Sequence, residues 1–122
     1  MATLFHLDHN KHSEGWDARL PLTKLMFAGM DGAKIERAWL ATELFEAGGY
    51  VRVAEIEGDE QFAVEATQNG VWSDSWSIEP PTGVMPYGRC GRRSTDLGDI
   101  LLIDGRLLMV DTSGFTPLPI PL

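Results

Sequence analysis

The chain of 122 residues has a single cysteine, Cys90, so an internal disulfide is excluded. This sparing use of cysteine suits a reducing compartment, and we expect a cytoplasmic protein. No apolar run approaches the roughly 20 residues that a membrane-spanning helix needs. The first residues also lack the basic and apolar stretches of a secretory signal. We therefore expect neither membrane insertion nor secretion.

Basic residues are scarce, at 10 Lys and Arg against 18 Asp and Glu, and the net charge is −8. The whole excess lies in residues 31–79, where eleven acidic residues accompany only Lys34, Arg37 and Arg52. An acidic surface repels a phosphate backbone over about 8–10 Å in ordinary salt, which argues against non-specific nucleic-acid binding there. The charge is compatible with a basic protein partner, with nucleic-acid mimicry, or with a solvated face that keeps the protein soluble.

The length and the 43% hydrophobic content fit one globular domain. Hydrophobic residues at helical spacing predict a helix between an Asp31 N-cap and Gly48-Gly49, with Trp39 in the core. A second helix is predicted over Glu60 to Gln68, capped by Asp59 and ended by Asn69-Gly70.

The remaining apolar stretches predict strands, joined by turns. Asp104-Gly105 between two apolar runs is the signal of a type I′ hairpin. Residues 20–27 are ambiguous because Pro21 disfavours a central strand, and the proline-rich end is predicted to be extended without ladder hydrogen bonds from Thr116 onward. The predicted strands are Ala2 to Leu7, Tyr50 to Glu57, Val71 to Glu79, Asp99 to Ile103 and Arg106 to Val110.

This order of elements predicts a small α+β domain over residues 1–116, with a mainly antiparallel sheet, two helices and a C-terminal β-hairpin. Residues 117–122 are predicted to form a proline-rich extended tail.

Several short motifs occur in an order that resembles a known family. They are Tyr50, Val53 and Ala54, then Ala66-Thr67-Gln68-Asn69 before Trp72, Arg93-Ser94-Thr95, Leu97-Gly98-Asp99-Ile100, Val110-Asp111 and Gly114-Phe115. They resemble the small, uncharacterised YodL-like proteins of phages, plasmids and other bacterial mobile elements, over somewhat more than half of the chain. Asp96 and Leu97 depart from the Ser and Val that are usual there. The resemblance implies a mobile-element origin and no particular activity.

Two groups of residues raise the question of catalysis or metal binding. His6, His9 and His12 recur every three residues and have suitable donor atoms for zinc or nickel, but exposed or capping histidines in a loop are the favoured interpretation. Cys90 has arginine neighbours that favour a thiolate, yet no histidine lies near it in sequence to act as a base. We therefore rank an enzyme last, and expect no bound cofactor or metal.

One loop gathers the candidate binding residues. Guanidinium groups and hydroxyls suit phosphate, and indole rings can stack on bases. The simpler interpretations are a solvated loop and tryptophans that serve as core or interface anchors. In the simpler interpretation Arg93 pairs with an acid from residues 31–79. The candidates are Arg89, Arg92, Arg93, Ser94 and Thr95, together with Trp72 and Trp76.

The sequence favours a non-enzymatic accessory protein of a phage or other mobile element that binds a protein partner, with a regulatory or antidefence role. The alternative is a small nucleic-acid-binding module that uses the Arg89–Arg93 loop. The sequence does not indicate an oligomeric state.

Overall fold

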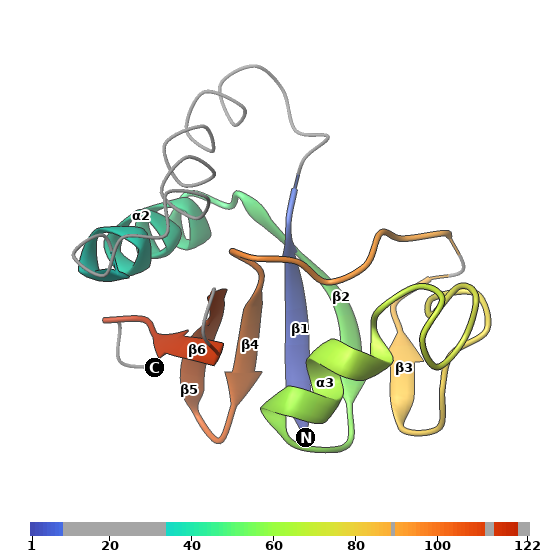
Figure 1. Cartoon of the computed structure of the whole chain (residues 1–122). Coiled ribbons are helices and arrows are strands. Elements are labelled where there is room, and N and C mark those ends of the chain that lie inside the picture. Colours follow the sequence, from blue (N-terminus) through green and yellow to red (C-terminus); the bar gives the residue numbers. More distant parts are fainter. Residues whose placement is uncertain (9–33, 89, 112–113, 120–122) are drawn as a thin grey trace.

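The computed structural model describes residues 1–8, 34–88, 90–111 and 114–119. Within these residues the chain forms an α+β domain with one six-stranded sheet and two helices (Figure 1), as predicted. The elements in chain order are β1 (Ala2–Leu7), α2 (Lys34–Glu46), β2 (Tyr50–Ile56), α3 (Glu60–Ala66), β3 (Val84–Pro86), β4 (Ile100–Ile103), β5 (Arg106–Asp111) and β6 (Gly114–Pro117).

The strands lie in the order β3-β2-β1-β4-β5-β6, and every neighbouring pair is antiparallel. The ladder between β1 and β2 shifts register between Leu4 and Phe5, which leaves Val53 as the extra residue of a bulge. Because directly paired residues project from the same face, the shift places Val51 beside His6. This pairing shapes the cavity described below.

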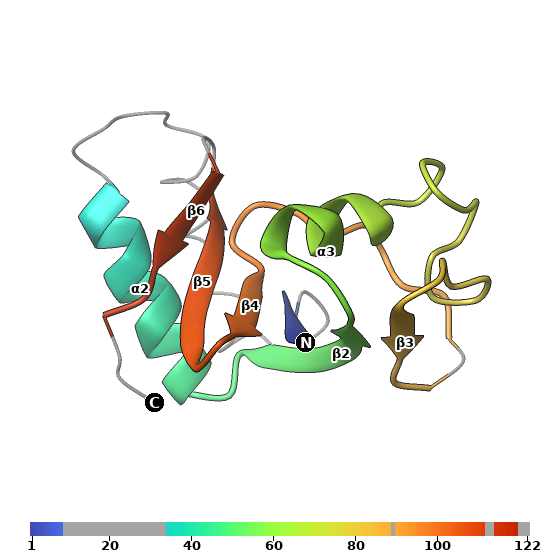
Figure 2. The same ribbon diagram turned by 90° about the horizontal axis from the view of Figure 1, so that it is seen from below.

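The sheet is covered on both faces, and each face has its own hydrophobic core (Figure 2). In β4, Leu101 and Ile103 belong to the core beneath α3, whereas Ile100 belongs to the core beneath α2. This alternation follows from the two-residue period of a strand, and it explains why β4 reads as a continuous apolar run.

The predicted turns and caps form where backbone geometry requires them. Asp104 and Gly105 both have positive φ, at 50° and 73°, and connect β4 to β5, which confirms the hairpin. Gly48 ends α2 with φ of 78°, and the Gly49 amide donates to the Leu44 carbonyl in a Schellman arrangement. The Asp59 carboxylate accepts a hydrogen bond from the Phe62 amide and caps α3, as predicted.

Three sequence predictions are wrong. Residues 71–79 form turns instead of a strand, because side-chain hydrogen bonds replace a ladder there. Trp39 is 54% exposed, since the buried face of α2 runs through Ala38, Ala41 and Leu44 instead. The C-terminal end does join the ladder: β6 extends to Pro117, and the Leu118 amide donates to the Leu107 carbonyl.

β3 was not predicted at all, because it is only three residues long and contains Pro86. The Asp31 cap and residues 20–27 lie outside the described residues. Among the residues that the structure describes, no helix has both the length and the apolar character to cross a membrane.

Candidate functional site

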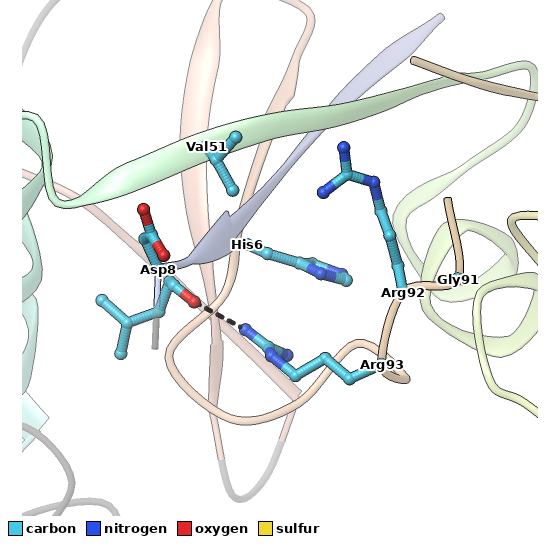
Figure 3. A pocket seen from close by; sticks show the side chains of 7 residues that line it. His6, Asp8, Val51, Gly91, Arg92 and Arg93 are labelled. Carbon is cyan, nitrogen blue, oxygen red and sulfur yellow. Dashed lines mark hydrogen bonds between the residues drawn. The ribbon is translucent and has the colours of Figure 1, made fainter. Parts of the chain in front are cut away.

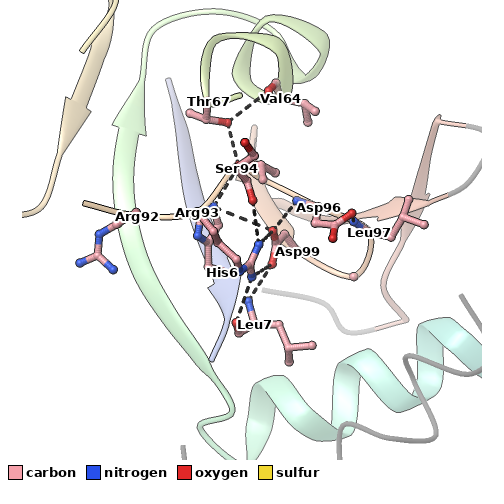
Figure 4. A network of polar contacts seen from close by, with 12 residues as sticks. His6, Leu7, Val64, Thr67, Arg92, Arg93, Ser94, Asp96, Leu97 and Asp99 are labelled. Carbon is pink, nitrogen blue, oxygen red and sulfur yellow. Dashed lines mark hydrogen bonds and ion pairs between the residues drawn. The ribbon is translucent and has the colours of Figure 1, made fainter. Parts of the chain in front are cut away.

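Asp99 is the centre of a buried polar network at the start of β4 (Figure 4). Its side chain is fully buried, and its two oxygens accept hydrogen bonds from both terminal nitrogens of Arg93, each at 2.7 Å. They also accept from the backbone amides of Leu7 at 2.8 Å and Asp96 at 2.7 Å. One carboxylate thus joins the end of β1, the loop before β4, and β4 itself.

Arg93 has no terminal N–H left for a ligand. Besides the two bonds to Asp99, it donates to the carbonyls of Leu7 and Ser94, each at 3.0 Å. Burial lowers the pKa of Arg93, but the hydrogen bonds and charge of Asp99 outweigh burial, so the pKa lies above its ordinary value. The prediction that Arg93 pairs with an acid from residues 31–79 is wrong, because its partner is Asp99, six positions along the chain.

The predicted binding residue Thr95 is also turned inward. Its hydroxyl lies 2.9 Å from the Nε2 atom of His6 and 2.7 Å from the hydroxyl of Thr67, and all three side chains are buried. The side-chain amide of Gln68 donates to the Thr95 carbonyl at 2.7 Å. Ser94 accepts a hydrogen bond from the amide of Asn69. The family-like motifs around residues 67–69 and 93–99 therefore contact each other.

The histidine does not form a catalytic relay with this carboxylate. A relay needs the acid on one ring nitrogen and the nucleophile on the other. The same Nε2 atom of His6 that contacts Thr95 is the one that lies 3.9 Å from Asp99, beyond hydrogen-bond range. The described residues contain no group of three or more metal-ligating side chains, and His9 and His12 lie outside them.

Asn69 and Trp76 hold the 69–77 segment against residues 90–93, which we call the arginine loop. The Asn69 side chain accepts from the Trp76 amide and donates to the Arg92 carbonyl, at 3.1 and 3.0 Å. The Trp76 indole donates to the Arg93 carbonyl at 2.9 Å, and Ser77 accepts from the Arg92 amide at 2.9 Å. Trp76 is fully buried, which confirms its interpretation as a core residue. The segment is therefore firmly positioned despite its lack of regular structure.

Tyr50, for which the sequence predicted a place in a strand and a part in the family resemblance, is also a member of this network. Its hydroxyl donates to the Gly98 carbonyl at 2.6 Å. Burial, helped by the negative charge of Asp99 and opposed by Arg93, raises the pKa of Tyr50 above its ordinary value. A tyrosine that starts a strand is too common a feature to mark such a contact in advance.

A cavity of about 410 Å³ opens beside this network, between the end of β1, the start of β2 and the arginine loop (Figure 3). Arg92 lines it, and the Nε atom of Arg92 is buried and has no hydrogen-bond partner. Cys90 is exposed and does not line the cavity, and Arg89 lies outside the described residues. The lining residues are His6, Leu7, Asp8, Val51, Gly91, Arg92 and Arg93.

The acidic excess of residues 31–79 lies at the surface. Arg37 is buried and pairs with Asp111 at 3.0 Å, so it does not offset this charge at the surface. Arg52 lies against the rings of Phe5 and Tyr87. Of the nine acidic residues of this segment whose burial is described, seven are exposed: Glu43, Glu46, Glu57, Asp59, Glu65, Asp74 and Glu79.

Large apolar side chains project from the same part of the chain. Val71, Trp72 and Ile78 are 66%, 57% and 60% exposed, and Asp74 and Glu79 stand among them in sequence. We call residues 71–79 the acidic–apolar segment. The edge of the Trp72 ring system contacts Phe62 of α3, with ring centroids 5.7 Å apart.

No family model, no curated protein and no solved structure matches this chain. The resemblance to YodL-like proteins therefore stays a prediction.

Proposed function

We propose that this chain is a non-enzymatic accessory protein of a phage or other mobile element, which acts in the bacterial cytoplasm by binding a protein partner with a basic surface. A regulatory or antidefence role would fit such an activity. The proposal rests above all on one observation: exposed apolar and acidic side chains share a segment that partly buried hydrogen bonds hold in place.

The rigidity of this segment favours binding. Association costs less free energy when the contacting groups are already ordered. The side chain of Trp72 is displayed by a segment whose other tryptophan, Trp76, is fully buried and bonded through its indole nitrogen. Tryptophan is one of the residue types enriched at the energetic centres of protein interfaces. The acidic–apolar segment is thus suited to act as a preformed contact surface.

The charge around the segment favours a basic partner. Asp74 and Glu79 are exposed within it, and Glu57, Asp59 and Glu65 are exposed on and around the neighbouring helix α3. Complementary charge raises association rates and disfavours partners of the wrong sign. Nucleic-acid binding through the arginine loop has less support, since Arg93 and Thr95 are engaged within the protein.

The test is a capture experiment with the immobilised full chain and an extract of the bacterium that carries its gene. The double variant Trp72→Ser/Ile78→Ser removes the apolar contacts, and Asp74→Lys/Glu79→Lys reverses the charges. We expect both to lose a basic protein that the unaltered chain retains at low salt and releases at high salt.

The variant Glu43→Lys/Glu46→Lys is the matched control, because it reverses two exposed charges on α2, outside the acidic–apolar segment. It should keep the partner. Equal capture by all variants would overturn the proposal. Retention of the unaltered chain on single-stranded DNA, in place of any protein partner, would favour the nucleic-acid alternative.

A further inference from the structure

Arg92 differs from the other arginines that the structure places in or near the interior. Arg37 pairs with Asp111, and the terminal N–H groups of Arg93 are bonded to Asp99 and two carbonyls. Arg92 is half-buried, and none of the ion pairs among the described residues includes it. Among the described residues, the Arg92 side chain makes one hydrogen bond, a long one of 3.3 Å to the Tyr87 carbonyl. A guanidinium with spare donors therefore faces the 410 Å³ cavity.

The buried Nε–H group of Arg92 indicates which kind of ligand the cavity binds. The Nε–H of Arg92 is buried without an acceptor, which costs free energy unless a water or a ligand accepts from it. A guanidinium offers Nε–H and a terminal N–H side by side, and this fork matches the two oxygens of an oxyanion. We propose that the cavity binds a small monocarboxylate, with its carboxylate group on Arg92.

The other cavity walls favour a carboxylate over a phosphate. Asp8 lines the cavity as a further acid, while the charge of Arg93 is already balanced by Asp99 (Figure 3). Among the described residues that line the cavity, Arg92 is the arginine outside any ion pair, and the negative charge of Asp8 repels a dianion more strongly than a monoanion. Val51 and Leu7 form an apolar part of the cavity wall, which suits the apolar part of the ligand. The volume lies within the range of small-molecule sites.

His6 contributes a second feature of the site. Its ring is 3% exposed, lines the cavity, and is held in place by Thr95 at 2.9 Å and by an edge contact with Trp76 at 5.8 Å between ring centroids. A ligand on Arg92 would therefore lie near a fixed aromatic ring. Its proton resonances give an independent report of occupancy.

The experiment is a titration of the uniformly ¹⁵N-labelled full chain, followed by the Nε–H signal of Arg92 and the ring protons of His6. Sodium benzoate is the probe, and sodium chloride at equal ionic strength is the blank. We expect saturable shifts of both residues with benzoate and none with chloride. The absence of saturation, or equal shifts at exposed arginines such as Arg106, would overturn the site.

Three variants distinguish binding by the paired N–H donors of Arg92 from attraction by positive charge alone. Arg92→Gln should weaken benzoate binding at least tenfold, and Arg92→Lys should weaken it too, because lysine keeps the charge but lacks the fork. Arg106→Gln, which removes an exposed charge of the β4–β5 hairpin, should change nothing. Unaltered binding by Arg92→Gln would overturn the proposal.

Two further measurements test the location of the site and the choice of a carboxylate over a phosphate. Val51→Trp fills the cavity without changing Arg92, and it should abolish benzoate binding even if the Arg92 variants fold poorly. Inorganic phosphate at neutral pH should bind more weakly than benzoate. Tighter binding of phosphate would overturn the carboxylate assignment.

Discussion

Arg93 and Asp99 meet through two parallel hydrogen bonds, in which each carboxylate oxygen accepts from a different terminal nitrogen at 2.7 Å. Asp99 is fully buried, whereas one third of the Arg93 side chain is exposed. The pair closes the loop before β4 onto the end of β1, because Arg93 also donates to the Leu7 carbonyl and Asp99 accepts from the Leu7 amide. We therefore regard this ion pair as structural.

Asp99→Asn should lower the free energy of unfolding by about 3 kcal/mol, the lower end of the range for breaking a buried pair, because Arg93 is partly exposed. An asparagine has one acceptor oxygen where four N–H groups now share two. Urea unfolding at neutral pH measures the change. Asp104→Asn in the hairpin turn is the control, since asparagine tolerates its positive φ, and it should change stability by less than about 0.5 kcal/mol. A loss below about 1 kcal/mol for Asp99→Asn would contradict the structural role.

Tyr50 should make the protein less stable in alkali. Its pKa is raised in the folded state, so above about pH 10, the ordinary value, the unfolded chain releases a proton that the folded chain keeps. The contribution of Tyr50 to the free energy of unfolding is therefore fully present below about pH 10, and it falls by about 1.4 kcal/mol per pH unit above that value. Urea unfolding between pH 8 and pH 11.5 measures the slope.

Tyr50→Phe should reduce this slope, and it should cost about 1 kcal/mol at neutral pH through the lost bond to Gly98. Tyr87→Phe is the matched control. The pKa of Tyr87 is also raised, chiefly by its hydrogen bond to Glu55, but its side chain is exposed to solvent, which screens the interaction. An alkaline slope that persists in Tyr50→Phe and disappears in Tyr87→Phe would show that the wrong tyrosine was chosen.

Gly105→Ala should destabilise the β4–β5 hairpin by about 1 kcal/mol. The backbone there has φ of 73°, which disfavours a Cβ, while the space around the added methyl group is empty. Gly91→Ala is the control, because the new Cβ would only reach ordinary contact, 3.7 Å from the Ile78 side chain. Thermal unfolding of both variants compares them, and an equal loss would show that the positive φ of Gly105 is not the cause of the destabilisation.

The sequence predicted those parts of the fold whose cause is local. Asp104-Gly105 determines its turn by its own backbone preferences, and Asp59 caps α3 with its own side chain. The 71–79 segment shows the opposite case. Its alternating Trp72, Trp76 and Ile78 resemble a strand pattern, but hydrogen bonds to distant residues, such as the one that the Trp76 indole donates to the Arg93 carbonyl, fix the segment as turns. β3 depends in the same way on β2, with which it pairs.

The candidate site was predictable only in outline. The sequence brought attention to Arg92, Arg93 and Thr95, but residue type cannot tell which arginine is neutralised inside the protein. That distinction depends on Asp99 being buried against Arg93 and on Arg92 lying beside the cavity. The role of His6 likewise required its contact with Thr95, which lies 89 positions away.

Trp72 and Trp76 should respond in opposite ways to truncation, since one is 57% exposed and the other fully buried. Trp76→Ala should cost about 3–5 kcal/mol, because it leaves a large cavity in the core beneath α3 and removes the donor to the Arg93 carbonyl. Trp72→Ala should cost less than about 1 kcal/mol, the loss of its contact with Phe62. Urea unfolding followed by far-ultraviolet circular dichroism measures both without depending on indole fluorescence. A large loss from Trp72→Ala would mean that this side chain is needed for the fold, and its exposure would then no longer support a role in partner binding.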